Sequence, residues 1–405
     1  MALRARWEAA ARLLAHHRDV LDGRPDEREA PAALVARGWA PYLLALDDAS
    51  LAALEVDGHE ATWPSDAPRS LLAFAAEART VCAIPLLASA SGSIHAPKRS
   101  ETPRKRAQID AFARYVVPLS AHATRVVDVG SGHGHLTREI AERIAQPVVG
   151  LERDAELASR ARELSRSASP SFAVMDVLRD GLAIVAGDCV IGLHACGELG
   201  DAMVEGAARC GASIALVGCC LQKRRGSSRR PLCAAGASGL ADGLVTALDL
   251  PKALLGLSNL TARDDGVEAP RSDNLAARER RLALHRLLTS VVGQLRLGAE
   301  IEGLNRRAAH RDLGSLVARA FAVRQLPSPP QGAIDAAARW ASTQHARARR
   351  LSLPRSLLAR ALEVFVLLDR ACYLEQHGLE VDTGALFPAS VSARNLVLVA
   401  HAPGR

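Results

Sequence analysis

The stretch Val126-Val-Asp-Val-Gly-Ser-Gly-His-Gly-His-Leu-Thr137 predicts the fold of the chain around it. Its first four residues are typical of a buried strand. Glycines follow at alternate positions: Gly130, Gly132 and Gly134. A helix pattern comes next, with apolar residues spaced four apart at Leu136, Ile140 and Ile144. Because glycine tolerates positive φ, the pattern predicts a tight loop and a helix N-terminus whose N–H groups face a ligand.

Strand and helix patterns alternate after this stretch. Further strands are predicted at Val148–Glu152, Phe172–Asp176, Cys189–Ala195 and Ser213–Cys220. This alternation predicts an α/β, Rossmann-like fold, in which a parallel sheet is covered by helices on both faces. The last strand, Asn395–His401, is expected to return to this sheet beside Gly384–Phe387. Ligands of such sheets bind beyond the carboxyl ends of the strands.

The chain is long enough for a core domain with additions. We predict a helical accessory region at residues 1–94 and the sheet domain at residues 95–405. The sheet domain is expected to contain a mainly helical insertion at about 224–380. One helix is predicted at Ala107–Val117, ended by Pro118, and another from about Pro354 to Gly378.

Charge favours an anionic partner. The net charge is +7 and the pI is about 9.2, which suggests RNA. Basic residues gather in Lys98–Arg106 and Lys223–Arg230, where they would contact phosphates. The alternative is a solvated surface in a protein from a GC-rich genome, because only four of the 51 basic residues are lysines.

Other bulk features point to the cytoplasm. The eight cysteines have no regular spacing, so a disulfide framework is not expected and a reducing compartment is favoured. No apolar run approaches the ~18 residues of a membrane helix.

The glycine loop departs from the two common nucleotide-binding motifs. The dinucleotide motif G-x-G-x-x-G would place its third glycine where His135 stands, and no G-K-[ST] follows for a P-loop. Acidic residues instead end the next two predicted strands, at Glu152 and Asp176. The first is placed to accept hydrogen bonds from ribose hydroxyls and the second from an adenine amino group.

This set resembles the S-adenosylmethionine site of class I methyltransferases. The resemblance implies S-adenosylmethionine as the cofactor and a sheet that ends in an antiparallel strand. It implies that Asp128 and the glycines face the methionine part, Glu152 the ribose and Asp176 the adenine. The alternative is a protein of the same fold with another ligand.

Two segments at later strand ends resemble the methyltransferase-like protein 25 family, and more distantly the ribose methyltransferases of the tRNA acceptor stem. They are the LHxCG segment Leu193-His-Ala-Cys-Gly197 and the GCC segment Gly218-Cys-Cys220. The likeness continues in Leu367-Leu-Asp-Arg370, Tyr373-Leu-Glu375 and Ser392-Ala-Arg-Asn395, although Ala393 stands where the family has proline. It covers about residues 95–400 and leaves the substrate open.

The candidate catalytic residues are His194, Cys196, Cys219 and Cys220. His194 could take a proton from a hydroxyl or amine acceptor, or simply bond to backbone at the strand end. Cys196 could orient substrate or pack as a small apolar residue. In a regular strand Cys219 and Cys220 would point to opposite faces.

A zinc site of His194, Cys196 and one of Cys219 or Cys220 is the alternative for these residues. Because no CxxC pair is present and methyl transfer from a sulfonium needs no metal, we expect none. The chain is therefore predicted to be a methyltransferase, acting on RNA in the first hypothesis and on protein side chains in the second. A third hypothesis is a non-catalytic binding module that keeps the fold.

Overall fold

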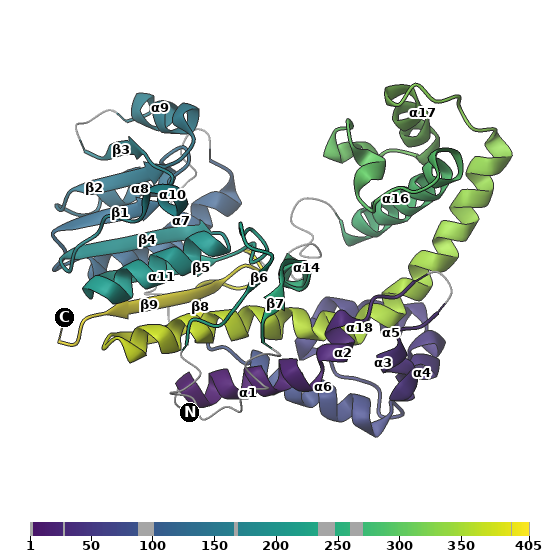
Figure 1. Ribbon diagram of the computed structural model, residues 1–405, viewed down its shortest axis with the longest axis horizontal. Helices are drawn as coiled ribbons and strands as arrows, with labels where there is room; N and C mark the ends of the chain where they lie inside the picture. Colours follow the sequence, from purple (N-terminus) through teal and green to yellow (C-terminus); the bar gives the residue numbers. More distant parts are fainter. Residues whose placement is uncertain are drawn as a thin grey trace. The chain divides into compact units, whose positions relative to one another are not determined.

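A computed structural model describes residues 3–26, 29–87, 101–165, 169–233, 248–259, 270–389 and 391–404. Its centre is a seven-stranded sheet with the order β3-β2-β1-β4-β5-β9-β8 (Figure 1). The strands are β1 (Arg125–Val129), β2 (Val148–Glu152), β3 (Ser171–Val174), β4 (Asp188–Ala195), β5 (Ser213–Gly218), β8 (Glu380–Ala385) and β9 (Leu396–His401). A two-stranded sheet is formed by β6 (Ser228–Arg229) and β7 (Leu250–Pro251).

The pairing confirms the α/β, Rossmann-like fold. Strands β1 to β5 pair in parallel, and β9 is antiparallel to both β5 and β8. The return of the last strand to the sheet is therefore confirmed. The strand beside it, predicted at Gly384–Phe387, is β8, which begins four residues earlier at Glu380 and ends at Ala385.

Two of the parallel strands end earlier than predicted. Strand β3 ends at Val174, and Asp176 instead caps α10, where its carboxylate accepts from the Leu178 N–H at 3.1 Å. Strand β5 ends at Gly218, so neither Cys219 nor Cys220 lies in a regular strand.

Helices cover both faces of the sheet (Figure 1). They are α7 (Pro103–Leu119), α8 (His135–Ala141), α9 (Ala155–Glu163), α10 (Val177–Asp180) and α11 (Glu198–Cys210). One face packs α7 and α8 through a cluster that includes Phe112, Ile140, Ile191 and Val217. On the other face Met203 of α11 approaches Gly192. The central strands β1, β4 and β5 are thus buried over most of their length, which is why their sequences are near-continuous apolar runs.

Helix α7 is longer than predicted at both ends. Thr102 accepts the Lys105 N–H at 3.2 Å, and Pro103 occupies the first turn, where its missing N–H costs nothing. Pro118 lies inside the last turn rather than after it.

The sheet belongs to a compact unit of residues 1–22, 74–263 and 356–405. Its remaining helices are α1 (Leu3–His16), α2 (Arg18–Asp22), α6 (Arg69–Cys82, in part), α14 (Lys252–Leu255), η2 (Gly256–Asn259) and the second part of α18 (Gln331–Gln376). Trp7 of α1 stacks on Phe365 of α18 with ring centroids 6.1 Å apart.

The second compact unit comprises residues 23–73 and 264–355. It contains α3 (Ala32–Ala36), α4 (Trp39–Ala45), α5 (Asp48–Asp57), η1 (Gly58–Glu60), α16 (Arg271–Val292), η3 (Ala299–Ile301), η4 (Arg306–His310) and α17 (Leu313–Val323). Leu284, Leu288 and Phe321 are part of its core. Glu55 accepts from both Arg271 and Arg349, so one carboxylate links three separate segments of this unit.

These units follow boundaries other than the predicted division into residues 1–94 and 95–405, which stays a prediction. The helix predicted from Pro354 begins at Gln331 and runs through this proline. Among the described residues, no helix is both long and apolar enough to cross a membrane.

Candidate functional site

The glycine loop between β1 and α8 has the backbone that the sequence predicts. Gly130, Gly132 and Gly134 have φ of 77°, 55° and 72°, a region that side chains with a Cβ rarely occupy. The N–H groups of Gly130 and Ser131 both donate to Leu151 O, which ties the loop to β2.

An aromatic ring closes the loop from the side of β3. A Cβ added at Gly134 would lie 2.5 Å from the Phe172 ring, and one added at Gly150 would lie 2.6 Å from it. Space around Gly132 is open, with no atom of the described residues within 4 Å of its added Cβ. Glycine at 134 and 150 therefore makes room for the ring, and glycine at 132 leaves backbone accessible.

Asp128 lies buried at the end of β1. Its Oδ2 accepts a hydrogen bond from Thr137 Oγ1 at 2.7 Å, and the residue is 2% exposed. Burial raises the pKa of Asp128 to about 7, and the Glu152 charge adds to this rise, while the Thr137 hydrogen bond opposes it. Asp128 is thus poised to ionise when a cationic group arrives.

Glu152, at the end of β2, is hydrogen-bonded to the backbone of the glycine loop. Its Oε2 accepts from the Gly132 N–H at 2.9 Å, and its Oε1 accepts from the Asp154 N–H at 3.0 Å. A carboxylate offers about four lone-pair positions, so acceptor capacity remains for a diol.

The glycine loop also contains a buried hydroxyl group without a hydrogen-bond partner among the described residues. This group is Ser131 Oγ. An open glycine cradle, an unsatisfied hydroxyl and two carboxylates are what a polar nucleoside ligand would use.

Asp176 forms an ion pair with the basic loop that follows β5, which contains Lys223–Arg230. Arg225 Nη2 lies 3.2 Å from Asp176 Oδ2, and Arg225 Nη1 donates to Leu178 O at 3.0 Å. The Arg225 N–H donates to Glu198 Oε2 at 2.6 Å, so this loop reaches from α11 to α10. Asp176 therefore lies at the N-terminus of α10 rather than at the predicted strand end, and it has a guanidinium beside it.

His194 lies at the end of β4 in a strained backbone. Its φ is 69°, and the pairing of β4 with β5 shifts register between Leu193 and Ala195. Non-glycine residues in this region cost about 1–3 kcal/mol and gather at functional sites. The positive φ and the register shift interrupt the regular alternation of side chains along β4 at His194.

The imidazole of His194 is held by Gln108 of α7, with Nε2 and Oε1 3.2 Å apart. Its Nδ1 is buried without a partner among the described residues. Burial lowers the pKa of His194 to about 4, and the charges of Arg394 and Arg104 lower it further. The ring is therefore neutral near pH 7, and a bond from Nε2–H to Gln108 leaves Nδ1 as the free acceptor.

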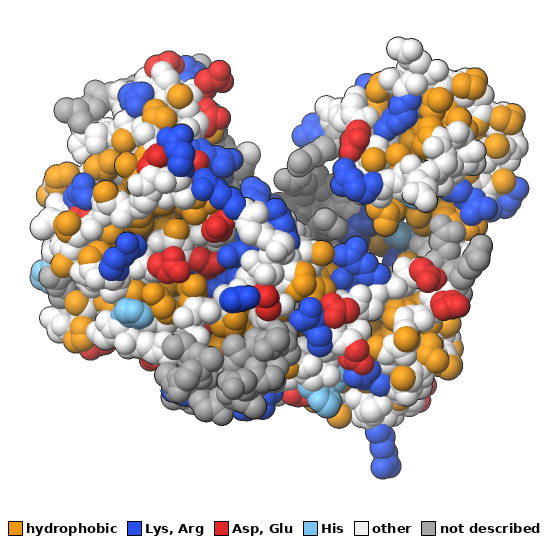
Figure 2. Space-filling view, viewed as in Figure 1, with side chains coloured by type: hydrophobic (Ala, Val, Ile, Leu, Met, Phe, Trp, Pro, Cys, Tyr) orange, Lys and Arg blue, Asp and Glu red, His pale blue; other side chains and the backbone are white. Residues whose placement is uncertain are grey.

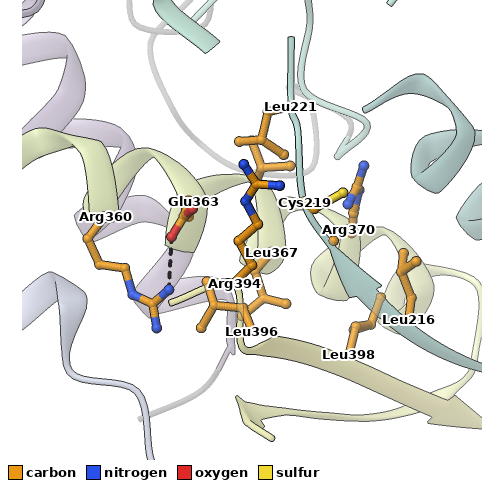
Figure 3. Close-up of a pocket in the computed structure, with 12 residues that line it drawn as sticks. Leu216, Cys219, Leu221, Arg360, Glu363, Leu367, Arg370, Arg394, Leu396 and Leu398 are labelled. Atoms are coloured by element: carbon orange, nitrogen blue, oxygen red, sulfur yellow. Dashed lines mark hydrogen bonds and ion pairs between the residues drawn. The ribbon is translucent and has the colours of Figure 1, made fainter. Parts of the chain in front are cut away.

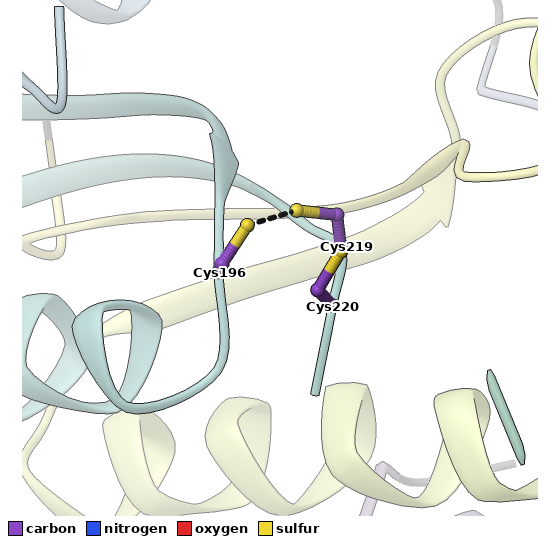
Figure 4. Close-up of side chains that lie close together, drawn as sticks. All are labelled: Cys196, Cys219 and Cys220. Atoms are coloured by element: carbon purple, nitrogen blue, oxygen red, sulfur yellow. Dashed lines mark hydrogen bonds between the residues drawn. The ribbon is translucent and has the colours of Figure 1, made fainter. Parts of the chain in front are cut away.

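Three cysteine sulfurs converge beside His194 (Figure 4). The Sγ atoms of Cys196 and Cys219 are 2.6 Å apart, and all three sulfurs, including that of Cys220, lie within 4.8 Å of one another. Cys219 and Cys220 would point to opposite faces only in a regular strand, and this condition is not met, because β5 ends at Gly218. The imidazole of His194 is not part of this group of possible metal ligands, but its carbonyl accepts from both Cys196 and Cys219.

A buried ion-pair network fixes the basic loop to α11 and α18. Asp201 accepts from Arg224, Arg229 and Arg370, and Asp369 pairs with Arg229 at 2.7 Å. Burial alone would raise the pKa of Asp201, but the charges of Arg229 and Arg370 hold it well below its usual range. Removing one partner of such a network typically costs ~3–5 kcal/mol.

This network changes the role expected of Lys223–Arg230. Arg229 is 2% exposed and Arg224 is half-buried, so both are structural. Lys223, Arg225 and Arg230 are the basic side chains of this segment that face solvent.

The earlier basic segment is likewise partly structural. Lys98 and Arg99 lie outside the described residues. Arg106 is fully buried, where it donates to Glu139 at 2.7 Å and contacts Asp110, and so cannot contact a phosphate. Arg104 donates to Ser392 at 3.2 Å.

A small cavity lies behind the cysteines (Figure 3). Its volume is about 30 Å³, and Cys219, Arg370 and Arg394 are among the residues that line it. This is room for about one water-sized molecule. Arg394 also donates to Cys220 Sγ at 3.3 Å and to Asn259 Oδ1 at 3.1 Å.

Residue-by-residue prediction missed the partners of the predicted site residues. Gln108 and Asp201 lie in unremarkable helix sequence, whereas Thr137 ends the glycine stretch and Arg225 belongs to the basic segment Lys223–Arg230, without a predicted partner. Arg370 and Arg394 fall in the C-terminal segments that carry the family resemblance, which was the one available signal.

Comparison with known proteins agrees with the fold. Residues 104–226 match the model of a family described as a methyltransferase domain. This span begins in α7 and ends in the basic loop, so it contains the glycine loop, Glu152, Asp176, His194 and the three converging cysteines. These residues form a methyltransferase domain of the class I fold, the class that uses S-adenosylmethionine.

Solved structures of methyltransferases are similar to parts of the chain. The sugar N-methyltransferase KedS8 from Streptoalloteichus sp ATCC 53650 is 20% identical over 33% of this chain and 59% of its own, with a TM-score of 0.23. The plantazolicin methyltransferase BpumL, in complex with SAH, is 12% identical over 37% and 63%, with a TM-score of 0.22. Coclaurine N-methyltransferase, bound to SAH, is 13% identical over 53% and 63%, with a TM-score of 0.24. The chain thus spans less than two thirds of the length of each.

Proposed function

We propose that the whole protein is an S-adenosylmethionine-dependent methyltransferase that acts on RNA. The glycine loop with Asp128 would hold the methionine part of the donor, Glu152 the ribose and Asp176 the adenine. The segments shared with the methyltransferase-like protein 25 family support placing the chain near that family.

His194 is the proposed acceptor-side base. The donor supplies a methyl group on a positively charged sulfonium, and the enzyme must orient a nucleophile in line with it. Nδ1 of His194 is a buried acceptor without a partner among the described residues, so an incoming O–H or N–H would satisfy it. Gln108 would hold the ring in the tautomer that leaves this atom free.

Cys196, Cys219 and Cys220 would line the same end of the sheet and orient the acceptor. No metal is required for this chemistry, because the leaving group is already a neutral thioether once the methyl group has moved.

The observation that carries the RNA proposal is the charge around His194. The guanidinium groups of Arg394 and Arg104 both act on its imidazole, and Lys223, Arg225 and Arg230 face solvent on the neighbouring loop. On the face drawn in Figure 2, basic side chains gather around α10 and the basic loop. A cationic acceptor site favours an anionic substrate, and phosphates are its most common form.

The acceptor can be identified by methyl transfer from radiolabelled S-adenosylmethionine into cell extract. We expect label that nuclease releases and protease does not. About two phosphate contacts, from Lys223 and Arg230, predict a slope near −1.4 in a plot of log affinity against log salt for single-stranded RNA. Label that survives nuclease but is lost with protease would replace RNA with a protein acceptor.

The role of His194 can be tested with His194→Asn. Asparagine also tolerates positive φ, so the backbone is kept while the base is lost. We expect methyl transfer to fall about 10²–10⁴-fold with donor affinity unchanged. His377→Asn, at an exposed histidine in the turn directly after α18, is the matched control. Equal rates in the two variants would rule out His194 as the base.

A further inference from the structure

Cys196 and Cys219 occupy facing positions just beyond two neighbouring parallel strands. Ala195 of β4 pairs with Gly218 of β5, so the two cysteines are the next pair along. Neighbouring strands lie ~4.8 Å apart, and disulfide-bonded cysteines have Cα atoms about 4.4–6.8 Å apart. The backbone of this pair is therefore already within the range that a disulfide needs.

The side chains are also directed at each other (Figure 4). Both cysteines are free thiols with Sγ atoms 2.6 Å apart. A disulfide bond is ~2.05 Å long, so small rotations about the side-chain bonds would close it. Cys219 and Cys220 are consecutive in the chain, which makes a bridge between them strained.

A metal ion is the other occupant that three converging thiols could hold. Sulfur ligands ~2.3 Å from a tetrahedral zinc ion lie roughly 3.8 Å from each other. Because a metal and a disulfide would each replace the hydrogen bonds to His194 O, the experiment has to distinguish the two.

A peroxide molecule would reach the pair from the side of Cys196. Cys196 is half-buried rather than fully buried, and Cys219 lines the cavity of about 30 Å³ beside Arg394. The hydrogen bond with Cys219 lowers the pKa of Cys196, and the charge of Lys223 lowers it further, which favours the thiolate, the reactive form.

We propose that Cys196 and Cys219 form a peroxide-sensitive dithiol that closes to a disulfide between the ends of β4 and β5. The Cys196 thiolate attacks one peroxide oxygen, the O–O bond breaks, and hydroxide leaves and takes a proton to become water. The Cys219 sulfur then displaces the hydroxyl of the resulting sulfenic acid, and a second water is released. The two thiols are oxidised and one hydrogen peroxide is reduced to two waters.

The bridge would act at the acceptor side of the site. Both thiols donate to His194 O in the reduced form, and a disulfide has no proton to donate. The strained turn at His194 would lose those two hydrogen bonds. The glycine loop and Glu152 lie on other strands, so donor binding should be unaffected.

Peptide mapping tests this proposal without any knowledge of the acceptor. The reduced full-length protein is treated with hydrogen peroxide, alkylated and cleaved with trypsin. Cleavage after Arg209 separates Cys196, in the peptide 180–209, from Cys219, in the peptide 210–223. We expect the two peptides to be joined, fragmentation to locate the bond at Cys196 and Cys219, and dithiothreitol to release them.

Variants identify the sulfurs. Cys219→Ser should abolish the joined peptides, and Cys210→Ser should keep them. Cys210 is the matched control because it lies in the same peptide and bonds to Gly206 O on α11. Fragmentation of the wild-type pair gives the same assignment if Cys219→Ser fails to fold. Three results would overturn the proposal. They are joined peptides that persist in Cys219→Ser, wild-type peptides that stay separate after peroxide, and one zinc ion per chain in native mass spectrometry.

Discussion

Replacing Glu152 with glutamine gives the most direct measure of the donor site. Glutamine keeps the shape of the side chain and one oxygen that can accept the Gly132 N–H, now bonded to Oε2 at 2.9 Å. It removes the negative charge and replaces the second oxygen with a donor, next to the Asp154 N–H. The loop is therefore largely preserved, and the main loss falls on the ligand.

The size of the loss follows from the bonds that a carboxylate makes to a ribose. A hydrogen bond to a charged group contributes ~1.5–3 kcal/mol. Losing one such bond should weaken donor binding roughly tenfold to more than one hundredfold, since ~1.4 kcal/mol is a factor of ten.

Isothermal titration calorimetry with S-adenosylhomocysteine measures this affinity without turnover. Glu156→Gln is the matched control, because Glu156 lies four residues on, in the first turn of α9, and is exposed. If Glu152→Gln and Glu156→Gln bind the ligand equally well, the assignment of Glu152 to the ribose is refuted.

Two further changes probe the same loop. Donor affinity should fall as pH drops from 8 to 6, because burial raises the pKa of Asp128 to about 7 and the protonated carboxyl group offers no charge to the ammonium group of the donor. Asp128→Asn should flatten this pH dependence in calorimetry. A pH dependence that survives in Asp128→Asn would contradict the role of Asp128 in donor binding. Gly134→Ala should destabilise the protein more than Gly211→Ala in urea unfolding, by about 1–3 kcal/mol. Both glycines have positive φ, but an added Cβ meets the Phe172 ring only at Gly134 among these two positions, so equal midpoints would contradict the packing argument.

The parts of the site that depend on local pattern could be predicted. The strand, the glycines and the acidic residue at the end of β2 follow from alternation and spacing, and Val148–Glu152 was predicted with its observed limits. Asp176 was placed on a strand, because a carboxylate next to apolar residues reads equally well as a strand end or as a helix cap.

The remainder depends on tertiary contacts. Gln108 reaches His194 across 86 residues, and Arg370 reaches Asp201 across 169, distances at which no sequence period carries information. The sequence predicts that a helix begins at Pro354, since proline usually interrupts one. The flanking Leu353 and Leu357 are both buried, and this packing offsets the missing hydrogen bond within the longer α18.

The ring of Phe172 has a consequence for how related sequences can vary. It touches the space above both Gly134 and Gly150, but only Gly134 has positive φ. Position 134 should therefore remain glycine whatever residue stands at 172. Position 150 is limited chiefly by the ring and by Ser131 Oγ, so alanine there becomes acceptable once residue 172 is smaller and the Ser131 hydroxyl has rotated away. Positions 150 and 172 should then change together in evolution, a coupled substitution that records their contact.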